Sequence, residues 1–353
     1  MSCSFGEKVK ITIFGQSHSS AMGVVIDGLP AGKKLDMEEI YSFMQRRSPG
    51  RDNISTARKE ADIPQILSGL VDGVTCGAPL CAIINNTDHH SKDYDNLKKV
   101  PRPGHADFTA FFKHNGFNDI RGGGNFSGRL TAPLCFAGNV CMQFLRDKNI
   151  SFGAHVENIA GIRDERFDPI NVNFDDVKGK DFPVISDAQG EKMREKILSA
   201  KSQTDSVGGV IECAITGLPI GLGEPMFGGV ENVISSAIFA IPAVKGIEFG
   251  AGFSCAEMMG SQNNDEFCIN KGSFATKTNN HGGILGGITS SMPVIFRVAM
   301  KPTPSIGKEQ QSVNLEKESE ENLVVHGRHD PCVVVRAVPC VEAAAAIAIM
   351  NLI

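Results

Sequence analysis

The chain has no tryptophan, only two tyrosines, and none of the short motifs that mark zinc or nucleotide sites. No C-x-x-C pair is present, so no zinc is expected and we predict no metal site. The phosphate loop G-x-x-x-x-G-K-[ST] is also absent, and no G-x-G-x-x-G joins a predicted strand to a helix. These absences argue against a nucleotide-binding phosphotransferase.

The sequence also lacks an excess of positive charge and a long apolar run. Its formal net charge is −5, whereas a general nucleic-acid binder is expected to be basic, so we predict no nucleic-acid partner. No apolar run looks long enough to span a bilayer. The first residues, MSCSFGEKVKITIF, show no secretory signal pattern. We therefore expect a cytoplasmic protein without a membrane segment.

The ten cysteines are scattered and mostly have apolar neighbours. This pattern is typical of free, buried thiols in a reducing compartment. A nucleophilic cysteine is possible, but no single cysteine stands out in the sequence.

The hydrophobic patterns predict an α+β fold with antiparallel sheets, because hairpins and scattered helices replace a regular strand–helix alternation. No stretch resembles a linker, so we expect residues 1–353 to form one domain. Strands are predicted at residues 8–14, 23–29, 65–70, 79–85, 152–162, 208–216, 292–299 and 333–338, and helices at 36–45, 131–145, 191–200, 228–241 and 341–353. An exposed arm at 53–62, a surface insertion at 163–187 and a mobile polar loop at 262–280 are expected between them.

Residues 101–129 contain the densest group of functional side-chain types. The stretch reads PRPGHADFTAFFKHNGFNDIRGGGNFSGR, with three arginines, two histidines and a triple glycine. Glycines allow the backbone to approach a ligand, and arginines bind phosphate or carboxylate through two N–H groups at once. The stretch thus favours a site for an anionic ligand with acid–base chemistry, although a glycine-rich surface turn with solvated charges would look the same.

His18 follows the first predicted strand in the segment GQSHSS, a common position for chemistry. A hydrogen-bonded structural histidine is the alternative, and it is the more frequent case. The pair His89-His90 lies in a polar stretch without other ligands in register, which favours an ordinary loop.

Ten segments, in order and nearly from end to end, resemble the chorismate synthase family. They are FGQSHS (14–19), IDGLPAG (26–32), RRSPGR (46–51), RPGHAD (102–107), RGGG with Ser127 and Arg129, GLGEP (221–225), AVKGIEFG (243–250), GGILGG (282–287), KPTPSI (301–306), and GRHDPC with RAVP (327–339).

The resemblance implies a β-α-β sandwich, with antiparallel sheets around helices, that assembles as a homotetramer. It implies conversion of 5-enolpyruvylshikimate 3-phosphate to chorismate by 1,4-elimination of phosphate, a step of aromatic amino acid biosynthesis in the shikimate pathway. Reduced FMN is implied as cofactor, although the reaction has no net redox change.

The resemblance also assigns residues. His18 would protonate the leaving phosphate, His105 would hold a proton near the flavin ring, and Asp330 would assist proton transfer. Substrate binding is implied for Ser17, Arg47, Arg51, Arg102, Arg129 and Arg336. FMN binding is implied for Asn125, Phe126, Ser127, Pro242, Ala243, Gly286, Lys301, Pro302, Thr303, Pro304, Ser305 and Arg328.

The chain departs from the common family pattern at two places in the FMN set. Many relatives have R-S-S-A-R where this chain has residues 125–129, NFSGR, and they commonly have asparagine where this chain has Pro242.

The sequence contains no long insertion that suggests a built-in reductase, so we expect an external flavin reductase, with NADPH as an indirect electron source. A phosphate- or nucleotide-binding transferase and a non-enzymatic binding scaffold are the alternative functions.

Overall fold

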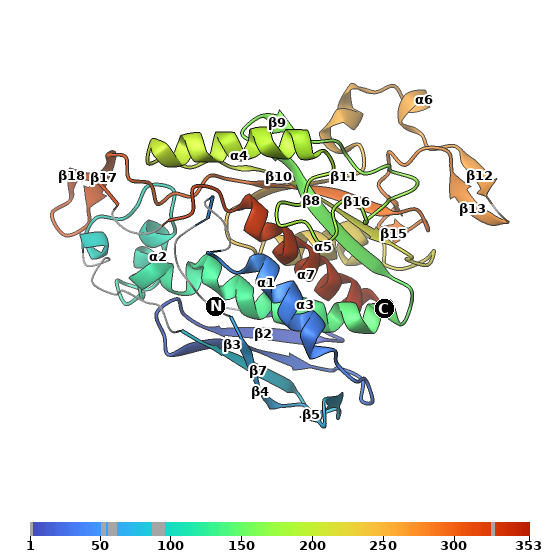
Figure 1. Cartoon of the computed structure of the whole chain (residues 1–353), viewed down its shortest axis with the longest axis horizontal. Coiled ribbons are helices and arrows are strands. Elements are labelled where there is room, and N and C mark those ends of the chain that lie inside the picture. The colour runs from blue at the N-terminus through green and yellow to red at the C-terminus, as the bar shows by residue number, and fades with distance from the viewer. Residues whose placement is uncertain (1–2, 51–53, 56–61, 87–95, 271, 326–328) are drawn as a thin grey trace.

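Two five-stranded antiparallel sheets form the outer layers of the computed structural model, which describes residues 3–50, 54–55, 62–86, 96–270, 272–325 and 329–353 (Figure 1). The first sheet has the order β1 (Ser4–Phe5), β2 (Lys10–Gly15), β3 (Ala21–Asp27), β7 (Leu80–Asn85), β4 (Pro64–Ser68). The second has the order β11 (Val244–Phe249), β16 (Val294–Met300), β10 (Gly209–Thr216), β8 (Ser151–Ile159), β9 (Ile162–Arg163).

A layer of helices fills the space between the sheets. It consists of α1 (Met37–Arg47), α3 (Thr131–Arg146), α5 (Val230–Ile238) and α7 (Val334–Leu352). One continuous hydrophobic cluster joins strands of both sheets to all four helices. The predicted α+β sandwich of antiparallel sheets around helices is therefore confirmed.

The helices α3 and α7 make backbone contact where they cross. A Cβ atom on Gly138 would overlap both the Cα and the Cβ of Ala343. Small side chains on both helices allow this approach, as expected from the small and apolar composition of residues 131–145. Close-packed interiors tolerate little added volume, so this crossing sets the thickness of the middle layer.

The strand predicted at residues 333–338 is wrong. These residues begin α7, which runs without interruption to Leu352 and contains Pro339 near its start. The valine-rich run looks like a strand by local preference, but burial between two sheets decides its conformation. By length and composition α7 could cross a bilayer, contrary to the expectation from sequence, yet 83% of its apolar window is buried inside the fold.

The first helix begins as its sequence predicts. Asp36 precedes α1, and its side chain accepts a hydrogen bond from the backbone N–H of Glu39 at 3.0 Å. This contact satisfies one of the N–H groups that every helix leaves unpaired at its start.

Several connecting segments are more ordered than predicted. The polar stretch 262–280 includes a hairpin of β12 (Phe267–Asn270) and β13 (Ser273–Thr276). Residues 163–187 bury Phe167 and Phe182, so they are not simply a surface insertion. Helix α4 (Asp187–Ser202) is longer than the predicted one. The remaining elements are β5 (Leu70–Val71), β6 (Val74–Thr75), α2 (Asp107–Lys113), α6 (Gly260–Asn263), β14 (Ile284–Leu285), β15 (Ile288–Thr289), β17 (Gln310–Asn314) and β18 (Ser319–Leu323).

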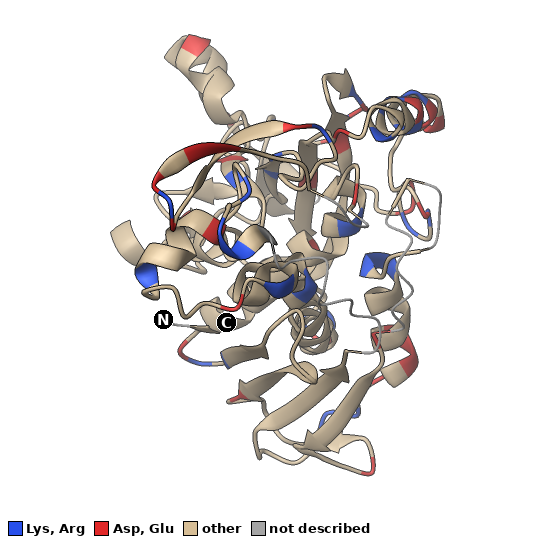
Figure 2. Ribbon diagram, turned by 90° about the vertical axis from the view of Figure 1, so that its left-hand side faces the viewer, with Lys and Arg blue, Asp and Glu red and all other residues tan. Residues whose placement is uncertain are grey.

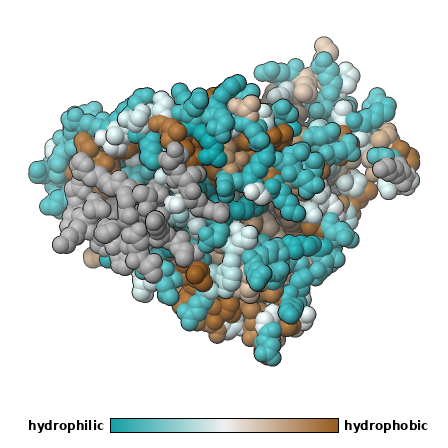
Figure 3. All heavy atoms as spheres, viewed as in Figure 1, coloured by the Kyte–Doolittle hydropathy of each residue, from teal (hydrophilic) through white to brown (hydrophobic). Residues whose placement is uncertain are grey.

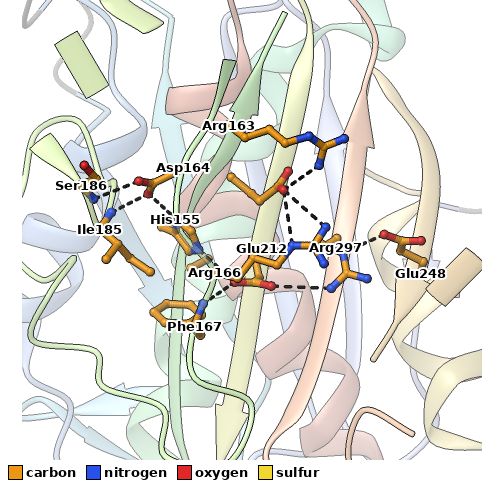
Figure 4. A network of polar contacts seen from close by, with 12 residues as sticks. His155, Arg163, Asp164, Arg166, Phe167, Ile185, Ser186, Glu212, Glu248 and Arg297 are labelled. Atoms are coloured by element: carbon orange, nitrogen blue, oxygen red, sulfur yellow. Dashed lines mark hydrogen bonds and ion pairs between the residues drawn. The ribbon is translucent and has the colours of Figure 1, made fainter. Parts of the chain in front are cut away.

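A buried polar network ties residues 163–187 to the second sheet (Figure 4). The ring of His155 contacts Asp164 through Nδ1 at 3.2 Å and Glu212 through Nε2 at 3.0 Å. Burial lowers the pKa of His155, but the two carboxylates outweigh it, so the net pKa is raised. Asp164 also accepts backbone N–H bonds from Ile185 and Ser186. His155 therefore has a structural role in this network.

Candidate active site

A cavity of about 530 Å³ lies at one end of the helical layer. The C-terminal end of α1 and the N-terminal ends of α3 and α7 meet there, with loops that follow α5 and β16. The volume is within the range of small-molecule sites. The N-terminal ends of two long helices add positive potential. The size of the cavity and the positive potential of these two helix ends both suit an anionic ligand.

The triple glycine runs beside the cavity, which Gly122 borders, with φ of 60°, 87° and 52° at Gly122, Gly123 and Gly124. These values favour glycine over any residue with a side chain. Space demands glycine as well, because a Cβ on Gly122 would overlap Ser17 Oγ and lie 2.5 Å from His18 Cε1. The loop therefore separates Ser17 and His18 from the cavity by the thickness of a glycine backbone.

His105 also borders the cavity and is held by a charged pair. Its Nδ1 lies 2.7 Å from a carboxylate oxygen of Asp107, which we assign as acceptor of the Nδ1 proton, and its Nε2 faces Gly123. Arg102 binds both oxygens of Asp107, through Nε at 2.6 Å and Nη2 at 2.8 Å. Burial raises the pKa of Asp107, but the bonds from Arg102 and His105 outweigh it and lower the net pKa. A fixed carboxylate thus sets the orientation of the ring.

Asp62 joins two of the predicted substrate arginines. Its side chain is fully buried, with one oxygen 2.5 Å from Arg47 Nη1 and the other bonded to Arg129 Nη1. Burial raises the pKa of Asp62, but the two guanidinium groups outweigh it, so the net pKa is lowered. The backbone of Asp62 has a φ of 50°, an uncommon conformation for a residue other than glycine.

The predicted exposed arm is wrong for its described residues. Asp62, Ile54 and Ser55 are all buried. Residues 53 and 56–61 of that arm lie outside the described residues.

Asp330 and Arg336 form a third pair at the start of α7. The carboxylate of Asp330 accepts from Arg336 Nη1, and Arg336 Nε donates to the backbone oxygen of Arg47 at 2.9 Å. Both residues line the cavity. The contact with the Arg47 backbone links α1 to α7, so Arg47, Arg129 and Arg336 form one connected group.

Most residues predicted from the resemblance border this one cavity. Those that do are His105, Asp330, Arg47, Arg102, Arg129, Arg336, Asn125, Phe126, Ser127, Pro242, Ala243, Lys301, Thr303, Pro304 and Ser305. Ser17 and His18 lie directly behind Gly122. Gly286, in the turn between β14 and β15, and Pro302, beside Gly208, do not border the cavity. Arg51 and Arg328 lie outside the described residues.

Comparison with known proteins gives the same result as the motifs. A model of the family described as chorismate synthase matches residues 9–353. The chorismate synthase of Lancefieldella parvula is 45% identical, covering 99% of this chain and 96% of that protein. The chorismate synthase of Korarchaeum cryptofilum is 43% identical over 98% of this chain and 96% of its own length.

The chain belongs to the chorismate synthase family. A crystal structure of a chorismate synthase superposes with a TM-score of 0.76 at 25% identity, over 99% of this chain and 92% of that one. The two alternative functions considered from the sequence, a phosphate- or nucleotide-binding transferase and a non-enzymatic binding scaffold, are therefore no longer supported.

Sequence reasoning missed two of the carboxylates that position the arginines of this chorismate synthase family member, Asp62 and Asp107. Asp107 lies inside the RPGHAD motif, and its spacing of five residues from Arg102 was a local signal. Asp62 gave no such signal, because it contacts Arg129 from a stretch 67 residues away. Cys340 also borders the cavity, and the sequence did not single it out.

Replacing Asp62 should destabilise the fold, since Asp62→Asn leaves two buried guanidinium groups without their counter-charge. We expect a loss of about 3–5 kcal/mol in the free energy of unfolding at pH 7, measured by denaturant titration. Asp72→Asn is the matched control, because Asp72 is exposed but has a similar φ of 52°. A loss of less than about 1 kcal/mol would contradict the pairing.

The same variant gives a pH test. The folded pKa of Asp62 lies below its ordinary value, so its contribution is complete above the unfolded pKa of about 4 and is lost as the pH falls through the folded pKa. The stability gap between the native protein and Asp62→Asn should therefore narrow below about pH 4.

Proposed function

We propose that this protein converts 5-enolpyruvylshikimate 3-phosphate to chorismate with the help of reduced FMN. The observation that supports this most is the cavity, which four arginines and a lysine of the family motifs line. The substrate carries a phosphate and two carboxylates, and fixed guanidinium groups bind such anions through paired hydrogen bonds.

Arg47, Arg129 and Arg336 are proposed to bind the substrate. The carboxylates of Asp62 and Asp330 hold these side chains in place, so little rotamer freedom is lost when the ligand binds. We also propose Arg102 as a substrate contact, although three of its side-chain bonds already go to Asp107 and Ser305. Arg51 belongs to the same proposal by its motif alone.

The cavity suits FMN in size and in its set of donors. Lys301, Thr303 and Ser305 follow β16 along one side and offer an ammonium and two hydroxyl groups. Pro242 and Ala243 offer an apolar surface. We propose that these residues, with Pro304 and residues 125–127, hold the cofactor. Gly286, Pro302 and Arg328 stay assigned by the resemblance alone. Reduced FMN supplies electron donation and a hydrogen acceptor that no side chain provides.

Three side chains are proposed to move or hold protons. His105 keeps a proton at the cavity wall, with its ring oriented by Asp107. His18 is assigned by the resemblance to protonate the departing phosphate, and it lies directly behind Gly122. Asp330 lines the cavity and relays a proton beside the site. General acid help of this kind is worth about 10²–10⁴-fold in rate.

The proposed activity should require reduced flavin. The protein is mixed anaerobically with 5-enolpyruvylshikimate 3-phosphate and FMN, with or without dithionite, and chorismate absorbance and phosphate release are followed. Product should form only with dithionite. A third mixture contains NADPH in place of dithionite and no flavin reductase. We expect no product there, because we expect an external flavin reductase to be required. Product in that mixture would contradict the requirement. No product under any condition would contradict the proposed function.

The two proposed proton donors can be tested by substitution. His18→Ala and His105→Ala should each lower turnover by about 10²–10⁴-fold while the protein stays folded. His114→Ala is the matched control, because His114 ends α2 near the site but does not border the cavity. Near-native turnover in either variant would remove that histidine from the mechanism.

We also propose that the chain forms one domain and assembles as a homotetramer. The strands of the first sheet carry almost no charged side chains (Figure 2). Leu67, on β4 of that sheet, and Val71, on β5, are exposed, as are Phe267 and Phe274 on the β12–β13 hairpin. Hydrophobic side chains show at the surface over the first sheet and near the hairpin (Figure 3). Apolar patches of this kind mark contact surfaces. Two separate patches suit a closed tetramer, which needs more than one kind of contact.

Sedimentation equilibrium should give four times the 37.8 kDa chain mass. Phe267→Glu should lower the assembly state, because it places a charge on the hairpin patch. Phe117→Glu, at a highly exposed position outside both patches, should leave it unchanged. A monomeric native protein would contradict the tetramer.

A cytoplasmic location is proposed on the ten free thiols, since reducing compartments keep cysteines in that state. Five of them are buried and three are exposed, so the expected burial holds for about half. Recovery of the protein from a secreted fraction would contradict this location.

A further inference from the structure

Two buried thiols face each other beneath the cavity. Cys135 on α3 and Cys340 on α7 have their sulfur atoms 3.7 Å apart, although 205 residues separate them in the sequence. Cys340 borders the cavity, whereas Cys135 lies behind it with no exposed surface. The pair thus joins the cavity to the helix crossing in the core.

The two helices are close enough for a covalent link between these cysteines. Each cysteine lies three residues before the crossing of Gly138 with Ala343, where the backbones are in contact. A disulfide needs Cα atoms about 4.4–6.8 Å apart, a separation that helices in contact offer within one turn of their crossing. Side-chain rotation and a small shift of one helix can then bring the sulfur atoms to bonding distance.

The surroundings of Cys340 favour its reactive form. A hydrogen bond from the Cys135 thiol lowers the pKa of Cys340, burial opposes this, and the guanidinium groups of Arg47 and Arg336 add to the lowering. Burial raises the pKa of Cys135. The thiolate is the reactive form of cysteine, and positive neighbours favour it. One thiol is therefore activated and lies at the cavity, and its partner can react after it.

We propose that Cys340 and Cys135 form a dithiol site that hydrogen peroxide oxidises to a disulfide. The Cys340 thiolate attacks one peroxide oxygen, the O–O bond breaks, and hydroxide leaves and takes a proton to form water. The sulfur of Cys135 then attacks the resulting sulfenic acid, the S–S bond forms, the S–O bond breaks, and a second water leaves with the Cys135 proton. Two thiols and one peroxide thus give one disulfide and two waters.

The disulfide would change the positions of groups that contact Arg336 and Arg47 in the cavity. The Cys340 thiol donates to the backbone oxygen of Arg336 at 3.6 Å, and Thr131, one turn before Cys135, accepts from Arg47 Nε at 3.0 Å. A shift of either helix moves these groups, and a displacement of about 1 Å can cost about 100-fold in rate. This consequence, but not the oxidation itself, rests on the proposed function.

The oxidation is tested by mass spectrometry on the full chain without flavin. Protein is treated with hydrogen peroxide, alkylated under denaturing conditions and digested with trypsin. We expect a cross-linked pair of peptides, 130–146 and 337–353, lighter than the two dithiol peptides by two hydrogen atoms and separated by dithiothreitol. Fragment ions must place the link at Cys135, because Cys141 lies in the same peptide.

Matched variants isolate the pair. Cys135→Ala should abolish the link and leave a sulfenic acid on Cys340 that dimedone traps, whereas Cys141→Ala, at an equally buried position, should keep the link. An unmodified Cys340, a link to any other cysteine, or sulfenic acid without a link in the native protein would each overturn the proposal. These readouts need no turnover, so they stand even if the proposed activity fails.

Activity gives a separate readout. Peroxide should lower the turnover of the native protein about 100-fold, with recovery in dithiothreitol, and Cys135→Ala should lack that recoverable loss. Full activity of the cross-linked protein would overturn the effect on the arginines.

Discussion

The pairing of buried carboxylates with arginines is the constraint on which the site depends. An anion-binding cavity needs several guanidinium groups close together, and like charges in a buried space repel one another and lose their hydration. Asp62, Asp107 and Asp330 each hold one or two of these arginines by an ion pair. Removing one partner of such a pair is costly because the other charge stays buried. The carboxylates therefore make the basic cavity compatible with a stable fold.

The helical layer determines where the arginines lie around the cavity. The helices α1, α3 and α7 end or begin at the cavity, and both sheets hold them in one layer. The crossing at Gly138 and Ala343 allows no added volume, so the starts of α3 and α7 lie close together at the cavity. The same close contact brings Cys135 and Cys340 together. The close packing of α3 against α7 thus positions the arginines and also brings the two thiols together.

The triple glycine connects the two histidines proposed for proton transfer to this frame. His18 and His105 come from segments far apart in the chain, yet both rings lie against the backbone of residues 122–123. A larger residue at either position would push a ring away from the cavity wall. In the proposed reaction, which joins loss of phosphate to removal of a ring hydrogen, this arrangement would place the two histidines close to the proposed substrate arginines.

The sequence by itself determined the family and most residues of the cavity, because the motifs carry the arginines, histidines and glycines in order. It also predicted the early strands and the start of α1, where alternation and a capping aspartate act over a few residues. Only the tertiary structure decided that residues 333–338 are helical, that Asp62 is buried between Arg47 and Arg129, and that Cys135 meets Cys340. Each depends on contacts between segments distant in the chain, and such contacts leave no local periodicity to read.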